Sequence, residues 1–451
     1  MENNTLRKNE KIKVDIIDLT FEGLGVAKHN GLAIFVKGAL VNEEALIRIT
    51  KVEKRYALAD VISLDVISKD RVKVENKLLD STIPLQHLRY DKQLAFKTKI
   101  IKDIFAKSKT INDVRINKTD GSAKEWHYRN KTQVPVRDEN GKMVTGVFSN
   151  KSHQVLPVDD FKINLEGIDE TVSKVRDILM EFGEKPYNEK RHTGNIRHII
   201  VRKSEKTNEQ MIIIVTRSKS LFPTSKIIPA ITEKFPNTVS IIQNINNKKS
   251  SAIFGNESKT LFGTDSYKEE ILNKKFIVTP QSFLQVNTPQ AEKLYTKAID
   301  LLQLTGEEIV VDAYSGIGTI SLSLADKAKQ VIGIEVIQEA VDVANENAKL
   351  NNINNVSFKC GLVEEVIDSL EVKPNVIVVD PPRKGLDPDF VNSVININPD
   401  KIAYISCNPA TLVRDLEKFK EAGYAFNEVF PIDLFPQTVH VETVALLTRK
   451  K

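Results

Sequence analysis

The alternation of apolar and polar positions is clearest at the start of the chain, over residues 11–64. Short runs, such as Val14 and Ile16 with Asp15 between them, are separated by glycines. A period of two residues is typical of half-buried strands, so this stretch predicts a small β-barrel of about five strands. Such barrels often bind oligonucleotides, although a purely structural β module would show the same pattern. We assign the barrel to residues 1–66.

The next stretch begins with an amphipathic segment. Between residues 88 and 107 apolar side chains recur at helical spacing, and lysines fill the other face, which predicts a basic helix. Residues 128–276 then mix apolar runs typical of strands with one helical segment at 169–182. We predict an α+β central domain over residues 67–275, whose first helix packs either there or on the domain that follows.

Strands and helices alternate over residues 276–451. Asn287 and Thr288 before Pro289 predict a helix start, because proline fits the first helical position. Continuous β-branched runs then alternate with helical segments to the end of the chain, which is typical of a sheet covered on both faces. The fold class is therefore α/β, with a doubly wound C-terminal domain.

Composition excludes several classes of protein. Hydrophobic residues make up 41% of the chain and charged residues 28%, the balance of a globular protein rather than a disordered one. Apolar runs stay shorter than the roughly 18 residues of a membrane-spanning helix, and the polar start lacks the apolar centre of a secretory signal. We expect a cytoplasmic protein that contacts no membrane, and the sequence indicates no obligate protein partner.

The basic residues are unevenly distributed. The net charge is only +5, but residues 86–131 contain 12 Lys and Arg against 5 Asp and Glu. A local excess of this kind is typical of a surface that binds a phosphate backbone. A solvated helix face would have the same composition, so the pattern leaves both interpretations open.

A glycine turn in the C-terminal domain is a candidate ligand site. Asp312 ends a strand, Gly316 and Gly318 form the turn, and a helix follows. Glycines there let the backbone approach a nucleotide at the carboxyl edge of the sheet, and Glu335 at the end of the next strand is placed to accept hydrogen bonds from ribose hydroxyls. Both NAD and S-adenosylmethionine fit this pattern, as does a turn that binds nothing.

Three further apolar runs carry polar or reactive residues, namely Asp380, Cys407 and Glu442. If all three lie at carboxyl ends of parallel strands, they meet in one cleft. A thiolate that adds to carbon 6 of a uracil turns carbon 5 into a nucleophile for a methyl group, and a general base then removes the carbon 5 proton. Cys407 and Glu442 suit these roles if nearby positive charge or backbone amides lower the pKa of the thiol.

Plainer interpretations of these residues remain open on residue type alone. Cys407 fits an inert buried thiol, and Glu442 fits a charge that faces water from an edge strand. Cys360 follows a similar apolar run, so position does not choose between the two cysteines. Two cysteines are too few for a disulfide framework or a four-thiolate metal site, and a reducing compartment would keep both as thiols.

Five motifs together resemble the family of RNA uracil-5-methyltransferases: SFLQVN (282–287), DAYSGIGT (312–319), VVDPPRKGL (378–386), SCNPATL (406–412) and HVETVALL (440–447). The N-terminal module also resembles the TRAM domain, an RNA-binding barrel that precedes the catalytic part in the ribosomal branch of this family. The resemblance covers nearly the whole chain. It implies a class I methyltransferase domain at residues 276–451 that uses S-adenosylmethionine, not NAD, and acts on structured RNA.

The resemblance also implies roles for individual residues. Cys407 in SCNP looks like the nucleophile, which settles the choice over Cys360, and Glu442 in HVET looks like the proton acceptor. The implied cofactor and active-site contacts are Gln285, Tyr314, Gly316, Gly318, Glu335 and Asp380.

One departure from the family pattern concerns iron. Many ribosomal members have cysteines just before a QHL tripeptide that bind an iron-sulfur cluster, but Asp80 and Ile83 stand where cysteines would. We therefore predict a protein without an iron-sulfur cluster. The TRAM-like module favours 23S ribosomal RNA as substrate, with transfer RNA as the alternative.

Two readings outside this enzyme class account for fewer residues. An NAD-dependent oxidoreductase leaves Cys407 and Glu442 without roles. A non-catalytic RNA-binding protein with a relic methyltransferase domain need not retain them together with Asp380.

Overall fold

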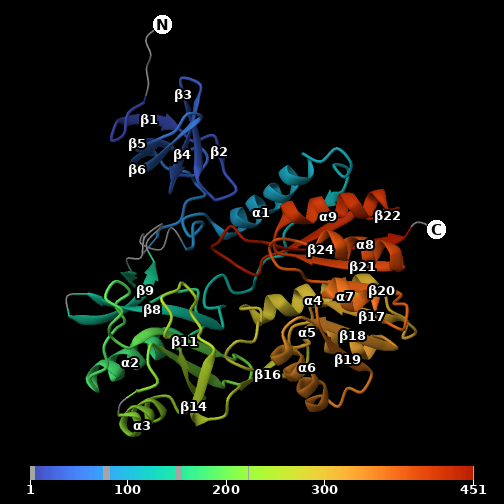
Figure 1. Cartoon of the computed structure of the whole chain (residues 1–451). Coiled ribbons are helices and arrows are strands. Elements are labelled where there is room, and N and C mark those ends of the chain that lie inside the picture. The colour runs from blue at the N-terminus through green and yellow to red at the C-terminus, as the bar shows by residue number, and fades with distance from the viewer. Residues whose placement is uncertain (1–5, 75–81, 140, 149–154, 222, 450–451) are drawn as a thin grey trace.

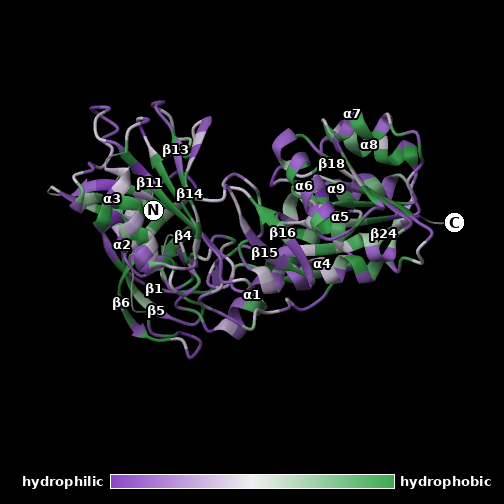
Figure 2. Ribbon diagram, turned by 90° about the horizontal axis from the view of Figure 1, so that it is seen from below, coloured by the Kyte–Doolittle hydropathy of each residue, from purple (hydrophilic) through white to green (hydrophobic). Residues whose placement is uncertain are grey.

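The computed structural model describes residues 6–74, 82–139, 141–148, 155–221 and 223–449. The chain forms an N-terminal barrel (blue in Figure 1), a central domain (green) and a C-terminal domain (orange to red). Hydrophobic positions concentrate on the strands of the sheets, whereas the helices carry both hydrophobic and polar positions (Figure 2). This division places the apolar core between the sheets and their covering helices.

The barrel is a six-stranded sheet in the order β1-β5-β6-β4-β3-β2. It exceeds the expected number because the first apolar run divides into two strands. Ala45, Ile47 and Ile49 alternate with more exposed residues and are buried, as a period of two requires. The strands are β1 (Lys11–Asp15), β2 (Asp18–Leu19), β3 (Gly25–His29), β4 (Leu32–Lys37), β5 (Glu44–Val52) and β6 (Tyr56–Val66).

Helix α1 (Tyr90–Phe105) follows the barrel in the sequence and packs on the C-terminal domain beside α9 (Pro409–Glu421) (Figure 1). Its Ile101 and Phe105 belong to the same apolar core as helices of that domain. The prediction that lysines fill the solvent face is wrong at Lys97, which is fully buried against Asp433.

The central domain is a seven-stranded sheet in the order β10-β9-β8-β11-β12-β13-β14, with two helices on one face. The second helix was not predicted, and Pro229 inside it argues against a helix from sequence alone. The elements are β8 (Lys131–Glu139), β9 (Lys142–Phe148), β10 (Val155–Pro157), α2 (Ile168–Glu181), β11 (Ile196–Lys203), β12 (Gln210–Thr216), α3 (Thr224–Lys234), β13 (Thr238–Ile245) and β14 (Glu257–Gly263).

The C-terminal domain is a nine-stranded sheet in the order β19-β18-β17-β20-β21-β24-β23-β7, with β22 also paired to β24. Successive residues of a strand face opposite layers, so Val378 packs under α4, α5 and α6, while Ile377 and Val379 pack under α7, α8 and α9. The strands are β7 (Arg115–Ile116), β17 (Ile309–Ala313), β18 (Gln330–Glu335), β19 (Val356–Cys360), β20 (Val376–Val379), β21 (Lys401–Ser406), β22 (Tyr424–Ala425), β23 (Glu428–Ile432) and β24 (Glu442–Arg449).

Local sequence signals start several helices of this domain. The side chain of Asn287 accepts a hydrogen bond from the Gln290 amide, and Pro289 follows at the predicted start of α4. Asn408 caps α9 in the same way. The helices are α4 (Thr288–Leu302), α5 (Thr319–Leu324), α6 (Gln338–Leu350), α7 (Val363–Asp368), α8 (Pro388–Ile397) and α9, with a 3-10 turn at Ala325–Lys327.

The central and C-terminal domains share an apolar core. Ile200 and Ile213 of the central sheet pack in one cluster with residues of α4 and of the hairpin β15 (Tyr267–Ile271) and β16 (Lys274–Val278). The expected domain boundary between residues 275 and 276 falls inside β16, and it stays a prediction. Within the ranges that the structure describes, no helix is long and apolar enough to cross a membrane.

Candidate active site

Cys407 and Glu442 meet at one edge of the nine-stranded sheet. Cys407 follows β21, which is parallel to β20. The expectation that Glu442 lies at the carboxyl end of its strand is wrong: it begins β24, which is antiparallel to β21, and its first residues therefore lie at the same edge. Because Ser406 pairs with Thr443, Cys407 and Glu442 are the next residues on the two adjacent strands.

Glu442 is a buried carboxyl with an unsatisfied oxygen. Its side chain is 2% exposed, and Oε2 has no hydrogen-bond partner within the described part of the chain. Burial, followed by the charge of Asp380, raises its pKa to about 8, although Arg383 opposes the rise. A carboxyl in this state costs stability unless another group completes its contacts, which is typical of a functional site.

Cys407 is half-buried, and burial raises the pKa of its thiol to about 11. This value includes the effect of the neighbouring carboxyls of Glu442 and Asp380, which raise the pKa after burial, and of Arg383, which lowers it. The lowered pKa that the role of nucleophile requires is therefore not met in this structure, because burial and the two acidic groups outweigh the charge of Arg383. Formation of the thiolate depends on changes in this local charge balance.

Two aspartates continue the acidic cluster into the sheet. Asp380 directly follows β20, and burial together with the charge of Asp312 raises its pKa to about 7. Asp312 is fully buried and accepts a hydrogen bond from Ser321 Oγ at 2.5 Å, and burial raises its pKa to about 7 as well. Tyr295 of α4 lies among these carboxyls, which raise its pKa in addition to the effect of burial.

The glycine turn takes the predicted place between β17 and α5. Gly318 has a φ of 85°, and a Cβ there would lie 2.8 Å from Phe358 Cζ, so a larger residue does not fit. Glu335 Oε2 accepts a hydrogen bond from the Gly316 amide at 3.1 Å, and Oε1 accepts one from the Ile337 amide at 3.0 Å. This carboxylate therefore holds the turn and the start of α6 together.

Exposed apolar side chains surround Glu335. Val336 is 56% exposed, Ile337 59% and Leu362 45%. Large apolar side chains at such exposure, beside a carboxylate at the end of a strand, are suited to cover the apolar face of a ligand. Tyr314, on the other side of the turn, has a φ of 68° and packs edge-on against Phe390.

Gln285 lies in a loop that the central domain holds in place. Its side chain is buried, and its backbone carbonyl oxygen accepts a hydrogen bond from Asn130 Nδ2 at 3.1 Å. Arg202 of β11, fully buried, donates from one guanidinium nitrogen to the carbonyl oxygens of Thr279, Pro280 and Ser282. The central sheet therefore positions the SFLQVN motif.

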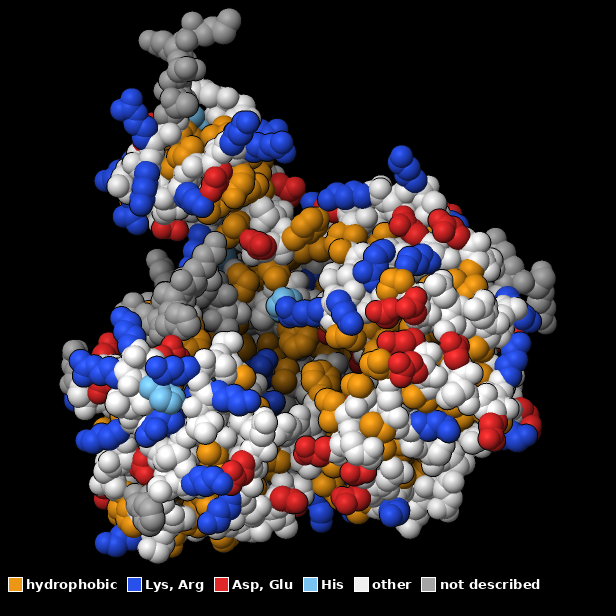
Figure 3. Space-filling model, viewed as in Figure 1, with side chains coloured by type: hydrophobic (Ala, Val, Ile, Leu, Met, Phe, Trp, Pro, Cys, Tyr) orange, Lys and Arg blue, Asp and Glu red, His pale blue; other side chains and the backbone are white. Residues whose placement is uncertain are grey.

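A cleft of about 1220 Å³ runs from the central domain to the active-site edge. The hollow between the two domains is visible in Figure 3. Arg383, Thr438 and His440 contribute to its wall from the C-terminal domain, and an Arg383 nitrogen lies 3.5 Å from His440 Nε2. Sequence reasoning missed Arg383, His440 and Tyr295 as members of the site, although the first two lie inside the quoted motifs.

Cys360 lies far along the sheet from this group. It ends β19, the edge strand, and β18, β17 and β20 separate that strand from β21. Its side chain is exposed.

Metal ligands do not gather in the part of the chain that the structure describes: no group of three His, Cys, Asp or Glu side chains is placed to hold an ion. Ile83, which stands where a cysteine was expected for a cluster-binding member, packs in an apolar cluster with Tyr128 and Ile163. Asp80 lies outside the described residues. The prediction of an iron-free protein therefore stays a prediction, and an absorbance band near the visible region in anaerobically purified protein would contradict it.

The doubly wound domain, its glycine turn and the adjoining cysteine and carboxylates define an enzyme of the methyltransferase class. The family model for tRNA (uracil-5-)-methyltransferases matches residues 255–450, and the TRAM domain model matches residues 6–62. An uncharacterized RNA methyltransferase of Enterococcus faecalis is 46% identical over 454 residues, 100% of this chain and 99% of the relative. One from Lactiplantibacillus plantarum is 44% identical over 455 residues, 100% of this chain and 99% of the relative.

A solved structure shows the same architecture from end to end. The tRNA (uracil-54, C5)-methyltransferase of Pyrococcus abyssi, in complex with S-adenosyl-L-homocysteine, has a TM-score of 0.79 and 29% identity, covering 97% of this chain and 99% of its own. The chain therefore belongs to the RNA uracil-5-methyltransferase family, as its motifs indicated.

Proposed function

We propose that this protein transfers a methyl group from S-adenosylmethionine to carbon 5 of a uridine in structured RNA, with Cys407 as nucleophile and Glu442 as general base. The observation that carries the proposal is the buried carboxyl of Glu442, unsatisfied at Oε2, on the strand next to Cys407. Neither an oxidoreductase nor a relic binding protein requires this pair.

The residues around the glycine turn fit S-adenosylmethionine, whose product occupies the Pyrococcus abyssi enzyme. In this proposal Glu335 accepts hydrogen bonds from the ribose hydroxyls, and the exposed side chains of Ile337 and Leu362 cover the adenine. When bound, the cofactor supplies an electrophilic methyl group on its sulfonium. Gln285, Tyr314 and Asp380 are proposed as further contacts.

The chemistry of the protein side chains takes three steps. The Cys407 thiolate adds to carbon 6, and the electron pair of the carbon 5–carbon 6 double bond makes carbon 5 nucleophilic. Carbon 5 then takes the methyl group. The carboxylate of Glu442 removes the carbon 5 proton, and the released electron pair re-forms the double bond as the thiolate leaves. Because the pKa of Glu442 is about 8, its active form increases with pH through that value.

The RNA class is proposed from the barrel, and 23S ribosomal RNA remains our preferred substrate. The tRNA enzyme of Pyrococcus abyssi covers 97% of this chain, a range that includes the barrel region, and this similarity favours transfer RNA as the second candidate. A cytoplasmic location stays a prediction from the sequence.

The test compares the two RNAs directly. We would incubate the protein with S-adenosylmethionine and unmodified transcripts of either 23S ribosomal RNA or transfer RNA, and measure 5-methyluridine by mass spectrometry. Product on ribosomal RNA that disappears with Cys407→Ala is the expected result. Product on transfer RNA alone would keep the chemistry and overturn the preferred substrate, and product on neither would favour the relic binding protein.

A further inference from the structure

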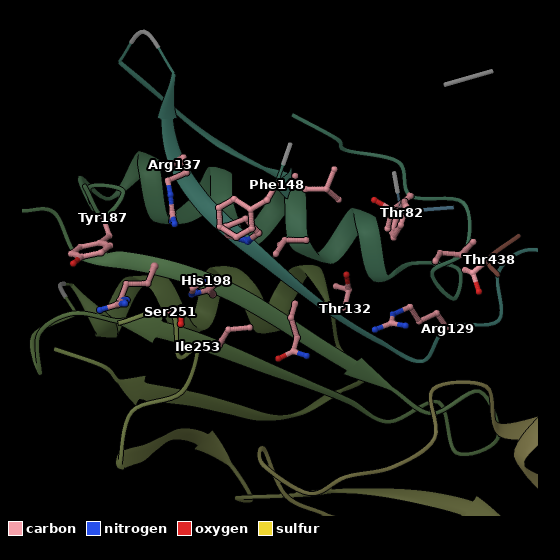
Figure 4. Close-up of a pocket in the computed structure, with 18 of the residues that line it drawn as sticks. Thr82, Arg129, Thr132, Arg137, Phe148, Tyr187, His198, Ser251, Ile253 and Thr438 are labelled. Atoms are coloured by element: carbon pink, nitrogen blue, oxygen red, sulfur yellow. The ribbon is translucent and has the colours of Figure 1, made fainter. Parts of the chain in front are cut away.

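The cleft continues well beyond the active-site edge, and its far end belongs to the central domain alone. Figure 4 shows Tyr187, Arg137, Phe148, His198 and Ser251 around this end, whereas Thr82, Arg129 and Thr438 lie at the other. All of them line the same cleft. We call the first five residues the far pocket. The reaction proposed above uses none of them.

Positive charge and aromatic rings meet in the far pocket. Arg197 lies with its guanidinium carbon 4.4 Å from the centroid of the Tyr187 ring. The same side chain donates to the carbonyl oxygens of Asn246 and Lys248, at 2.8 and 2.7 Å, and so shapes the loop that carries Lys249 into the cleft. Cations beside aromatic faces are the combination that single-stranded nucleic acid sites use.

His198 contributes polar ring nitrogens to the far pocket. It lies on β11 opposite Pro135, its side chain is 8% exposed, and Nδ1 has no hydrogen-bond partner among the described residues. Burial, followed by the charges of Arg137 and Arg197, lowers its pKa to about 3, so the ring is neutral at physiological pH. A neutral imidazole has one donor and one acceptor nitrogen. A buried nitrogen without a partner is costly, and a ligand that bonds to it recovers that cost.

We propose that the far pocket binds one unpaired nucleotide of the substrate RNA, separate from the methylated uridine. Its base stacks on the aromatic side chains, His198 and Ser251 contact the base edge, and the adjoining phosphates face Lys249 and Arg137, which also forms an ion pair with Glu189 of the cleft wall. The occupant is single-stranded RNA because splayed-out loop bases present both a stacking face and a free edge. This inference rests on the proposed function for the RNA substrate and adds a second point of recognition.

Binding of short RNA tests the proposal. Fluorescence anisotropy would follow fluorescein-labelled single strands of about twelve nucleotides, one for each base, a length within the usual site size of such surfaces. Lys249→Ala is expected to weaken binding of all four strands equally. The slope of log K against log salt concentration should fall by about one. His198→Phe keeps a ring but removes the polar nitrogens, and is expected to reduce the preference among bases, weakening the best strand roughly fivefold to a hundredfold.

Matched controls keep the result interpretable. Lys226→Ala removes an exposed lysine from α3, on the opposite face of the central sheet, and should leave binding unchanged. Ser251→Ala, at an exposed position, replaces His198→Phe if that variant fails to fold. Wild-type affinity and base preference in both Lys249→Ala and the base-reading variant would overturn the proposal, as would failure of the wild type to bind any strand. Normal cofactor binding without methylation would instead count against the proposed function.

Discussion

Two groups of buried charged side chains, one around Asp433 and one around Glu442, differ in their partners. In the first, Lys97 Nζ and Asp433 Oδ1 lie 2.6 Å apart with both side chains fully buried, and Tyr90 donates to the other carboxylate oxygen at 2.9 Å. In the second, Glu442 keeps an unsatisfied oxygen, and the charge of Asp380 raises its pKa while Arg383 lowers it. A buried charge with its partner in place is tolerated, and loss of that partner is costly, whereas a buried group that lacks a partner costs stability and is typical of a functional site.

The first group also supports the second. Gln93 Nε2 donates to Gln437 Oε1 at 2.8 Å, and the backbone N–H of Gln437 donates to Gln93 Oε1 at 2.9 Å. These bonds hold Gln437 at a φ of 70°, on the segment that leads to His440 and Glu442. Helix α1 therefore positions the strand that carries the proposed base, and we call Tyr90, Gln93, Lys97, Asp433 and Gln437 the polar latch.

Removal of the nucleophile should have the largest effect. We expect Cys407→Ala to lower kcat/KM for RNA methylation by about four orders of magnitude or more, because the reaction has no other route to a nucleophilic carbon 5. Cys360→Ala is the matched control and should retain activity, since that thiol lies on the edge strand β19. Equal losses in the two variants would contradict the assignment of Cys407.

Replacement of the proposed base should have the next largest effect. Glu442→Gln keeps the size of the side chain but cannot accept the carbon 5 proton, so turnover should fall by about a hundredfold to ten thousandfold. Wild-type turnover is expected to increase with pH, because Glu442, with a pKa of about 8, loses its proton over this range and the thiolate fraction of Cys407, with a pKa of about 11, rises as well. Steady-state rates between pH 6 and pH 9 would measure both effects, and a profile that declines over this range would contradict the role.

The polar latch should respond differently, with loss of stability rather than chemistry. Lys97→Met leaves Asp433 buried without its cation, and the free energy of unfolding should fall by about 3–5 kcal/mol. Lys99→Met, on the same helix with a side chain 52% exposed, should change it by less than about 0.5 kcal/mol. Chemical denaturation measures both. Equal free energies of unfolding in the two variants would show that the buried pair of Lys97 and Asp433 does not stabilise the fold.

The last expected effect is the dependence of stability on pH. Glu442 has a pKa of about 8 in the folded protein against an ordinary value of 4.5, so the folded state binds more protons between these values. Stability should therefore fall as pH rises from about 4.5 to about 8. Melting curves should show a smaller fall for Glu442→Gln. The raised pKa would be contradicted if the stability of the wild type rose over this pH window while that of Glu442→Gln did not.

Much of this fold follows from local patterns in the sequence. The alternation around Ile47 predicts the barrel, and Asn287 with Pro289 predicts the start of α4. The motifs also identify Cys407 and Glu442 as a pair before their geometry is known. These features could be predicted because each depends on residues close together in the chain or on a motif of several residues.

Other features depend on long-range contacts. Lys97 looks like a surface lysine until Asp433, 336 residues away, packs against it. The antiparallel direction of β24, and therefore the reason that Glu442 reaches Cys407, is set by the topology of the whole sheet. His198 looks like one more strand residue, and only its tertiary surroundings make it a neutral, unsatisfied group in a cleft.

The central claim is that Cys407 and Glu442 act on the same uracil. Glu442→Gln protein, incubated with S-adenosylmethionine and the RNA that the wild type methylates, would be digested with nuclease and protease and examined by mass spectrometry. We predict a peptide in which Cys407 carries a methylated uridine nucleotide, because the adduct forms but cannot lose its carbon 5 proton. An adduct at Cys360, or full turnover with no adduct, would contradict the claim.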